Sequence, residues 1–105
     1  MITNDNEFQD LITSDSALII ALNRADYHRV QTHINEWLEY LGFDFYQDLK
    51  NYIDKLDSIK NQKIIISFMP PFIKEIFDKG FNVFMVEDNK VHRMNLDKCR
   101  KYFDI

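Results

Sequence analysis

The stretch Lys63–Asn95 constrains the fold of this chain more than any other. It opens with three consecutive isoleucines and runs into a pair of prolines. β-Branched residues are stiff at χ1 and suit a pleated, buried surface, and a residue that precedes proline is pushed out of the helical region. These features predict a strand over residues 64–68. The apolar run FNVFMVE predicts a second strand over residues 81–87.

The segment between these two strands has apolar residues at helical spacing and ends at Gly80. A helix there is long enough to cross over between parallel strands, which takes roughly a dozen residues. Apolar residues on both faces of 81–87 predict that this strand is central and pairs in parallel with 64–68. Asp88 and Asn89 suit a hairpin turn into an antiparallel edge strand over 91–95.

The rest of the chain is expected to be helical. Residues 17–22 are apolar all round and predict a buried helix, with a strand as the open alternative. The apolar spacing predicts further helices over 26–41 and 44–60, joined as an antiparallel hairpin. Asn95 suits the N-cap of a last helix. The sequence thus predicts a single α+β domain over residues 1–105, with N-terminal helices packed on a three-stranded mixed sheet (strand–helix–strand–hairpin–strand) and a C-terminal helix.

Composition limits the environment of the chain. Hydrophobic residues make up 46% and charged residues 29% of the 105 positions, which is typical of a globular domain. The longest apolar run, Ala17–Leu22, is far shorter than the roughly 20 residues of a membrane span. The first residues lack the basic and apolar regions of a signal peptide, and one cysteine cannot form an internal disulfide. We therefore expect a cytoplasmic protein with no membrane contact.

Charge is distributed unevenly along the chain. Residues 1–60 carry 11 acidic and 5 basic side chains, whereas residues 61–105 carry 6 acidic and 8 basic ones. An acidic helical surface would steer a basic partner, so the first hypothesis is a protein-binding module such as an inhibitor, immunity protein or accessory regulatory protein. The candidate contact residues, acidic side chains with aromatic anchors, are Glu36, Glu39, Tyr40, Tyr46, Asp48, Asp54 and Asp57.

The basic C-terminal part supports a second hypothesis, nucleic-acid binding, which we rank below the first. Cations on the last strand and helix could line one phosphate-binding face, with Tyr102 and Phe103 available to stack on bases. Each charge also has a structural explanation, because edge strands and helix C-termini favour cations. The candidate residues are Lys90, His92, Arg93, Lys98, Arg100 and Lys101.

A small metal-dependent nuclease or hydrolase is the third hypothesis, and its only support is Glu87, Asp88 and Lys90, a spacing that such enzymes also use at a strand end. These residues fall on the predicted turn, where Asp and Asn have a conformational role. Cys99 falls on the apolar face of its helix, where a thiol is inert. We therefore expect no enzyme, no metal and no cofactor. The strand 64–68 would expose an apolar edge, so either the N-terminal segment shields it or a second copy of the chain pairs with it, and of these two we expect the homodimer.

Overall fold

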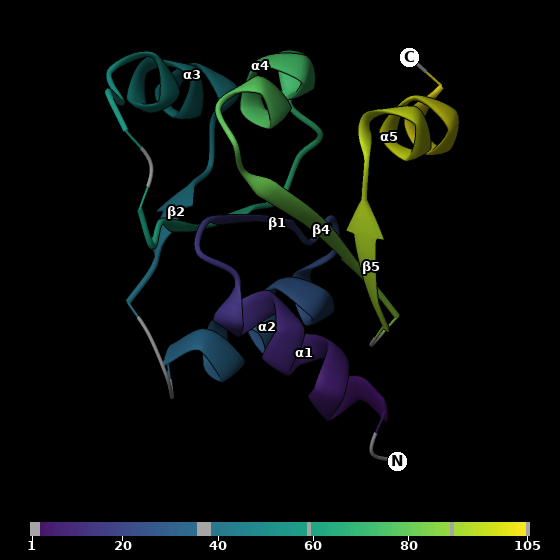
Figure 1. Cartoon of the computed structure of the whole chain (residues 1–105). Helices are drawn as coiled ribbons and strands as arrows, with labels where there is room; N and C mark the ends of the chain where they lie inside the picture. Colours follow the sequence, from purple (N-terminus) through teal and green to yellow (C-terminus); the bar gives the residue numbers. More distant parts are fainter. Residues whose placement is uncertain (1–2, 36–38, 59, 89, 105) are drawn as a thin grey trace.

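The structure, a computed structural model, describes residues 3–35, 39–58, 60–88 and 90–104. These residues form a mixed sheet of five strands in the order β2-β3-β1-β4-β5, with helices on both faces (Figure 1). The elements in chain order are α1 (Thr3–Thr13), β1 (Ala17–Ile20), α2 (Arg24–Asn35), β2 (Leu41–Phe43), α3 (Tyr46–Asp54), β3 (Lys63–Ile66), α4 (Ile73–Asp78), β4 (Asn82–Glu87), β5 (Lys90–Met94) and α5 (Leu96–Phe103).

The central strand of the sheet is β1. It pairs in parallel with β3 on one side and β4 on the other, and all four of its residues are buried. The prediction of a buried helix over 17–22 is therefore wrong, and the alternative of a strand is correct. A parallel strand covered on both faces is a continuous apolar run, which cannot be told from a buried helix by periodicity.

The position of β1 also changes the predicted sheet. The α+β class with a mixed sheet is confirmed, but the sheet has five strands instead of three. β4 does not pair with β3, because β1 lies between them, and β4 is next to the edge rather than central. The antiparallel pairing of β4 with β5 is confirmed by the register Glu87↔Lys90. Asp88 in the turn has a φ of 48°, the left-handed conformation expected in a two-residue hairpin.

The helices form two layers. α1 and α2 cover one face of the sheet, and α3, α4 and α5 cover the other (Figure 1). Phe8, Leu11, Val30 and Ile34 pack from the first layer against Phe84 and other side chains of the sheet. The second layer contributes Leu49, Ile53, Ile73, Ile76 and Cys99 to a separate core. The two apolar faces of β1 and β4 thus each have their own helical cover.

The predicted helix hairpin is wrong. α2 ends at Asn35 and α3 begins only at Tyr46, with the short strand β2 between them. β2 pairs in parallel with β3, so the chain crosses the sheet edge and the two helices lie on opposite faces. The residue at the N-cap of α3 is Phe45, and its side chain makes no capping hydrogen bond.

Other local predictions hold. Gly80 ends the crossover helix with a φ of 98°, a conformation that glycine adopts without strain. Asn95 caps α5, since its Oδ1 accepts a hydrogen bond from the Lys98 backbone N–H at 2.8 Å. Cys99 is fully buried as predicted, and burial raises the pKa of its thiol.

β3 has a partner strand on each side, β2 and β1. The reason for expecting a homodimer, an uncovered edge at residues 64–68, therefore no longer applies. Among the described residues there is no helix with the length and hydropathy needed to span a membrane.

Candidate functional site

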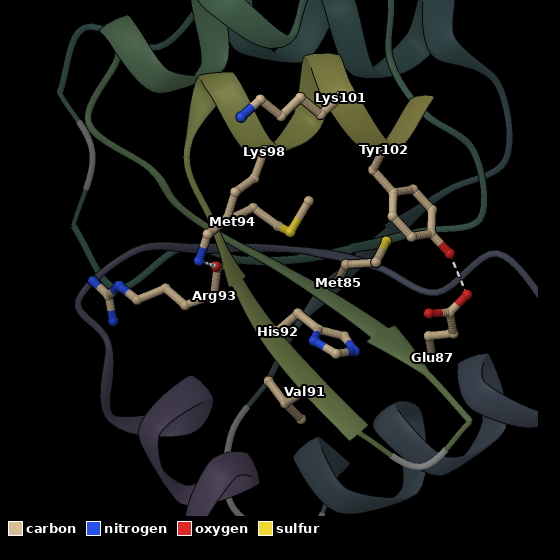
Figure 2. A pocket seen from close by; sticks show the side chains of 9 residues that line it. All are labelled: Met85, Glu87, Val91, His92, Arg93, Met94, Lys98, Lys101 and Tyr102. Carbon is tan, nitrogen blue, oxygen red and sulfur yellow. Dashed lines mark hydrogen bonds between the residues drawn. The ribbon is translucent and has the colours of Figure 1, made fainter. Parts of the chain in front are cut away.

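A groove of about 620 Å³ lies between β5 and α5 (Figure 2). Side chains of a strand alternate between the two faces of its sheet. Met94 belongs to the core formed with α3, α4 and α5, so its side chain lies on the α5 side of β5. His92, two residues earlier, points to the same side. Met85 of β4 is directly opposite His92 in the register. The floor of the groove is thus apolar, and an imidazole stands at its side.

The other wall of the groove is α5. Lys98, Lys101 and Tyr102 line the groove from this helix, at the three- and four-residue spacing that places side chains on one helical face. The Asn95 cap fixes where the helix begins, and buried Cys99 fixes its rotation against the core. Lys98 Nζ lies 3.4 Å from the Arg93 carbonyl oxygen, which links the helix to the edge strand.

Tyr102 and Glu87 join the two sides of the groove at one end. The Tyr102 hydroxyl donates a hydrogen bond to Glu87 Oε2 (Figure 2), and this bond raises the pKa of Tyr102 because it favours the neutral phenol. The Tyr102 side chain is nevertheless 47% exposed. Its ring therefore remains available to a ligand, while the Glu87 carboxylate is already engaged.

The structure brings together only part of the predicted basic set. His92, Arg93, Lys98 and Lys101 border the groove, Arg93 with the carbonyl that Lys98 reaches, whereas Lys90 and Arg100 do not border it. The Arg93 side chain points towards α1 (Figure 2): it donates to Asn82 Oδ1 at 2.8 Å and lies 3.5 Å from Asp10 Oδ2.

The sequence-based selection of site residues also missed members of the groove. Met85 and Met94 lie on the groove but were assigned only to strands, because nothing in their spacing distinguishes a groove floor from a core. The pairing of Met85 with His92 across the hairpin was the signal that could have placed Met85 beside the basic residues.

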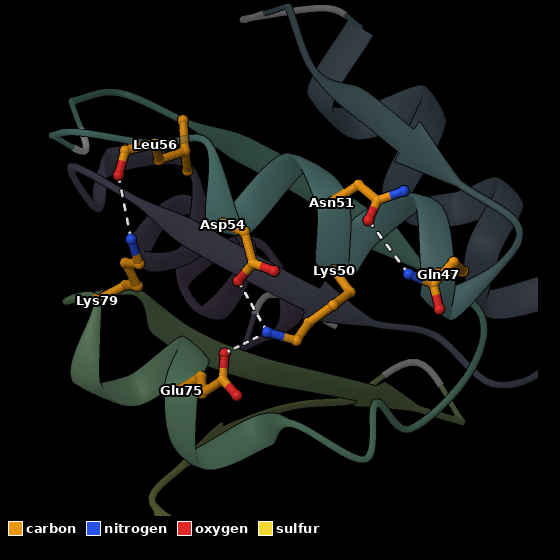
Figure 3. Close-up of polar contacts among 7 residues, drawn as sticks. All are labelled: Gln47, Lys50, Asn51, Asp54, Leu56, Glu75 and Lys79. Carbon is orange, nitrogen blue, oxygen red and sulfur yellow. Dashed lines mark hydrogen bonds and ion pairs between the residues drawn. The ribbon is translucent and has the colours of Figure 1, made fainter.

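The predicted acidic surface is partly neutralised on α3. Lys50 Nζ lies 2.8 Å from Asp54 Oδ1 and 2.7 Å from Glu75 Oε2, so one cation bridges α3 and α4 (Figure 3). The same two carboxylates raise the pKa of Lys50, Asp54 more than Glu75. Lys79 Nζ also reaches the Leu56 carbonyl oxygen at 3.1 Å. Asp54 therefore belongs to a helix–helix contact.

The remaining acidic candidates do not gather on one surface. Asp48 and Asp57 are exposed on the α3 side, with Tyr46 55% exposed. Glu39 is exposed on the segment before β2, and Tyr40 packs against the core formed with α1 and α2, with its hydroxyl accepting a hydrogen bond from Gln31. Glu36 lies outside the described residues.

The residues of the nuclease hypothesis have structural partners. Glu87 is bonded to Tyr102, and the Asp88 backbone N–H donates to Asp26 Oδ2 at 3.0 Å. Within the described ranges, no group of three or more His, Cys, Asp or Glu side chains could hold a metal ion. The interpretation of residues 87–90 as a hairpin is thus supported by geometry.

Comparisons with protein-family models, with curated protein sequences and with solved structures found no match. The geometry by itself defines the class of the fold: a mixed sheet, parallel except for its last strand, between two layers of helices. On the surface of that fold, the groove between β5 and α5 carries Lys98, Lys101 and the half-exposed Tyr102.

Proposed function

We propose that this protein is a protein-binding module whose partner docks in the groove between β5 and α5. The observation that carries the proposal is the placement of His92, Lys98 and Lys101 around an apolar floor of Met85 and Met94. The two lysines attract and orient an acidic partner, while affinity comes mainly from apolar surface that is removed from water, here chiefly the half-exposed Tyr102 ring. An acidic segment with an apolar anchor fits both properties. An inhibitor, an immunity protein or an accessory regulatory protein would bind its target through such a surface.

The side chains of the groove suit a protein ligand. Met85 and Met94 are only 2% and 8% exposed, so a partner touches these flexible side chains at the bottom of the groove and covers chiefly the Tyr102 ring, which is 47% exposed. Tyr102 offers a ring whose hydroxyl is already satisfied by Glu87, so its face can be covered without leaving a buried donor unpaired.

A basic partner on the acidic side of α3 is the other form of this proposal. Asp48 and Asp57 are exposed there and Tyr46 is an aromatic anchor. The support is weaker, because Lys50 neutralises Asp54 and Glu75 nearby. Charge reversal at Asp48 and Asp57 would slow association with a basic partner at low salt if this surface is the one used.

Single-stranded nucleic acid is the second candidate ligand of the groove. The specific observation in its favour is the exposed Tyr102 ring beside Lys101, since bases stack on aromatic rings while cations contact phosphates. The net charge of −4 opposes it, because a polyanion is repelled by the rest of the chain.

The test uses two labelled probes and fluorescence anisotropy: a peptide of alternating glutamate and leucine, and an oligothymidine. We expect the peptide to bind the wild-type protein and to lose about tenfold or more in affinity in the double variant Lys98→Glu, Lys101→Glu. The matched control is Lys55→Glu, Lys60→Glu, two exposed lysines that do not line the groove. Circular dichroism confirms that each variant is folded.

The two candidate functions give different results. Oligothymidine binding that falls steeply with salt, without peptide binding, would replace the protein-binding function by the nucleic-acid one. Equal peptide affinity in the groove variant and the control variant would contradict the groove as the binding surface. Binding of neither probe would contradict both functions.

We also keep a homodimer and a cytoplasmic location as proposals. Two copies would need a surface other than β3, and the exposed rings of Phe45 and Tyr46 beside Leu41 offer one. Light scattering tests the dimer. A wild-type mass of twice 12.7 kDa that falls to 12.7 kDa in the double variant Phe45→Ser, Tyr46→Ser would support it, and a wild-type mass of 12.7 kDa would contradict it.

The cytoplasmic location rests on Cys99, whose free, buried thiol is consistent with a reducing compartment.

A further inference from the structure

A second cavity, of about 510 Å³, lies outside the carboxyl ends of three parallel strands. It is bordered by Asn23 after β1, Asp44 after β2 and Ser67 after β3. These three positions are far apart in the sequence and meet because parallel strands end at the same edge of a sheet.

The topology of the sheet opens a crevice at this place. β1 continues into α2 on one face, and its neighbour β3 continues into α4 on the opposite face. The connection that follows β1 leads to β2 at one edge of the sheet, whereas the connection that follows β3 leads to β4, towards the other edge. Open sheets with parallel strands bind ligands where neighbouring strands diverge in this way, because the departing chains leave a gap beyond the strand ends.

One wall of the cavity is a polar face of α2. Arg24, Tyr27, His28 and Gln31 line it, and their spacing of three, one and three residues keeps them on one side of a helix. Tyr27 can lie there because β2 carries Gly42: a Cβ at that position would be 3.0 Å from the Tyr27 hydroxyl oxygen. The Tyr27 ring packs against the core formed with α1 and α2, and its hydroxyl lies at this edge of the sheet next to Gly42.

The polar side chains around the cavity have few partners within the protein. The described part of the chain provides no side-chain hydrogen bond or ion pair to Arg24, Asp44 or Ser67, whereas the Gln31 amide donates to Tyr40. Arg24, Asp44 and Ser67 are exposed, so water solvates this cation, carboxylate and hydroxyl in the free protein, and a ligand in the cavity would replace that water. Convergent polar groups in a cavity of this size are typical of small-molecule sites.

We propose that this cavity binds a small organic phosphate that carries hydroxyl groups. The planar guanidinium of Arg24 matches two phosphate oxygens at once, and His28, one helical turn further on, adds a ring N–H. Asp44 accepts hydrogen bonds from the alcohol hydroxyls of the ligand, which inorganic phosphate lacks. The cavity shares no lining residue with the β5–α5 groove, so the proposal is independent of the function proposed above.

The test is a backbone-amide NMR titration with three probes: ribose 5-phosphate, inorganic phosphate and ribose. We expect ribose 5-phosphate to shift the amides of Asn23, Arg24 and Ser67. Arg24→Ala should weaken this binding by about tenfold or more, since a hydrogen bond to a charged group is lost. Asp44→Asn should weaken binding of ribose 5-phosphate while leaving that of inorganic phosphate unchanged. The matched control is Arg100→Ala, an exposed arginine on α5 that should change nothing.

Three results would overturn the proposal. The first is the absence of shifts around the cavity with ribose 5-phosphate. The second is a set of shifts confined to Lys98, Lys101 and their neighbours, which would place the phosphate in the β5–α5 groove. The third is equal affinity for inorganic phosphate and ribose 5-phosphate, which would remove the role of the hydroxyls and of Asp44.

Discussion

The Asp26 carboxylate accepts a hydrogen bond from the backbone N–H of Asp88 at 3.0 Å, although 62 residues separate the two. Asp26 is 2% exposed and also accepts from Asn23 Nδ2 at 2.7 Å and from Arg29 Nη1 at 3.0 Å. One buried side chain therefore joins the first turn of α2 to the turn between β4 and β5.

Asp26→Ala should lower the free energy of unfolding by about 2–4 kcal/mol, because it leaves the Asp88 N–H and the Asn23 amide without their acceptor. Urea unfolding followed by circular dichroism measures the change. Asp57→Ala, at an exposed position, is the control and should stay within about 0.5 kcal/mol of wild type. An equally small effect of Asp26→Ala would mean that the contact contributes nothing to stability.

Two phenylalanines allow a matched test of the core. Phe84 is 1% exposed between β4 and the α1–α2 layer, whereas Phe45 is 69% exposed. Phe84→Ala should cost about 3–5 kcal/mol in unfolding free energy, and Phe84→Asp should prevent folding, because a cavity and a buried charge are both unfavourable. Phe45→Ala should change stability by less than about 0.5 kcal/mol. Similar melting temperatures for the two alanine variants would contradict the sheet assignment.

Cys99 should be unreactive in the native protein. It is fully buried and its thiol pKa is raised by burial, so little of the reactive thiolate is accessible at neutral pH. A thiol reagent that releases a chromophore should react slowly with native protein and at once in concentrated urea. Fast reaction in buffer would show that α5 opens or that Cys99 is exposed.

The raised pKa of Tyr27 predicts that the folded protein loses stability at alkaline pH. Burial is the main cause that raises the pKa of Tyr27, and the neighbouring Tyr40 and Asp44 add to it. Above the usual tyrosine pKa of about 10, the folded chain keeps a proton that the unfolded chain has lost. The contribution of Tyr27 to the free energy of unfolding is therefore complete below about pH 10. It is lost as the pH rises through the pKa of Tyr27 in the folded protein.

The measurement for Tyr27 is urea unfolding at a series of alkaline pH values, compared with Tyr27→Phe. We expect wild type to lose stability more steeply than the variant, which has no ionisable group at this position. Parallel curves would contradict the raised pKa, whatever the other tyrosines and lysines contribute to both.

Local chemistry explains which parts of the fold were predictable. The β4–β5 hairpin, the crossover helix before Gly80 and the Asn95 cap each depend on residues within a few positions of one another. β1 was ambiguous, since ALII has no periodicity that separates a strand from a helix. β2 was missed because three residues become a strand only through pairing with β3.

The candidate sites also combine features that depend on nearby residues with features that depend on pairing between distant segments. The sequence placed His92, Lys98 and Lys101 in one basic set but included Arg93, whose side chain the pleat of β5 turns to the opposite face, towards Asp10. The cavity beyond the strand ends was invisible, because Asp44 and Ser67 meet only when β2 and β3 pair in parallel.

The α+β class, the β4–β5 hairpin and the Asn95 cap follow from the amino-acid sequence, because backbone conformation at those points depends on side chains close in the chain. The central place of β1, the opposite faces of α2 and α3, and the grouping of polar side chains around a cavity arise only in the folded chain. Strand pairing and burial on two faces are interactions between distant segments, and the same short apolar run suits a helix or a strand until its neighbours are in place.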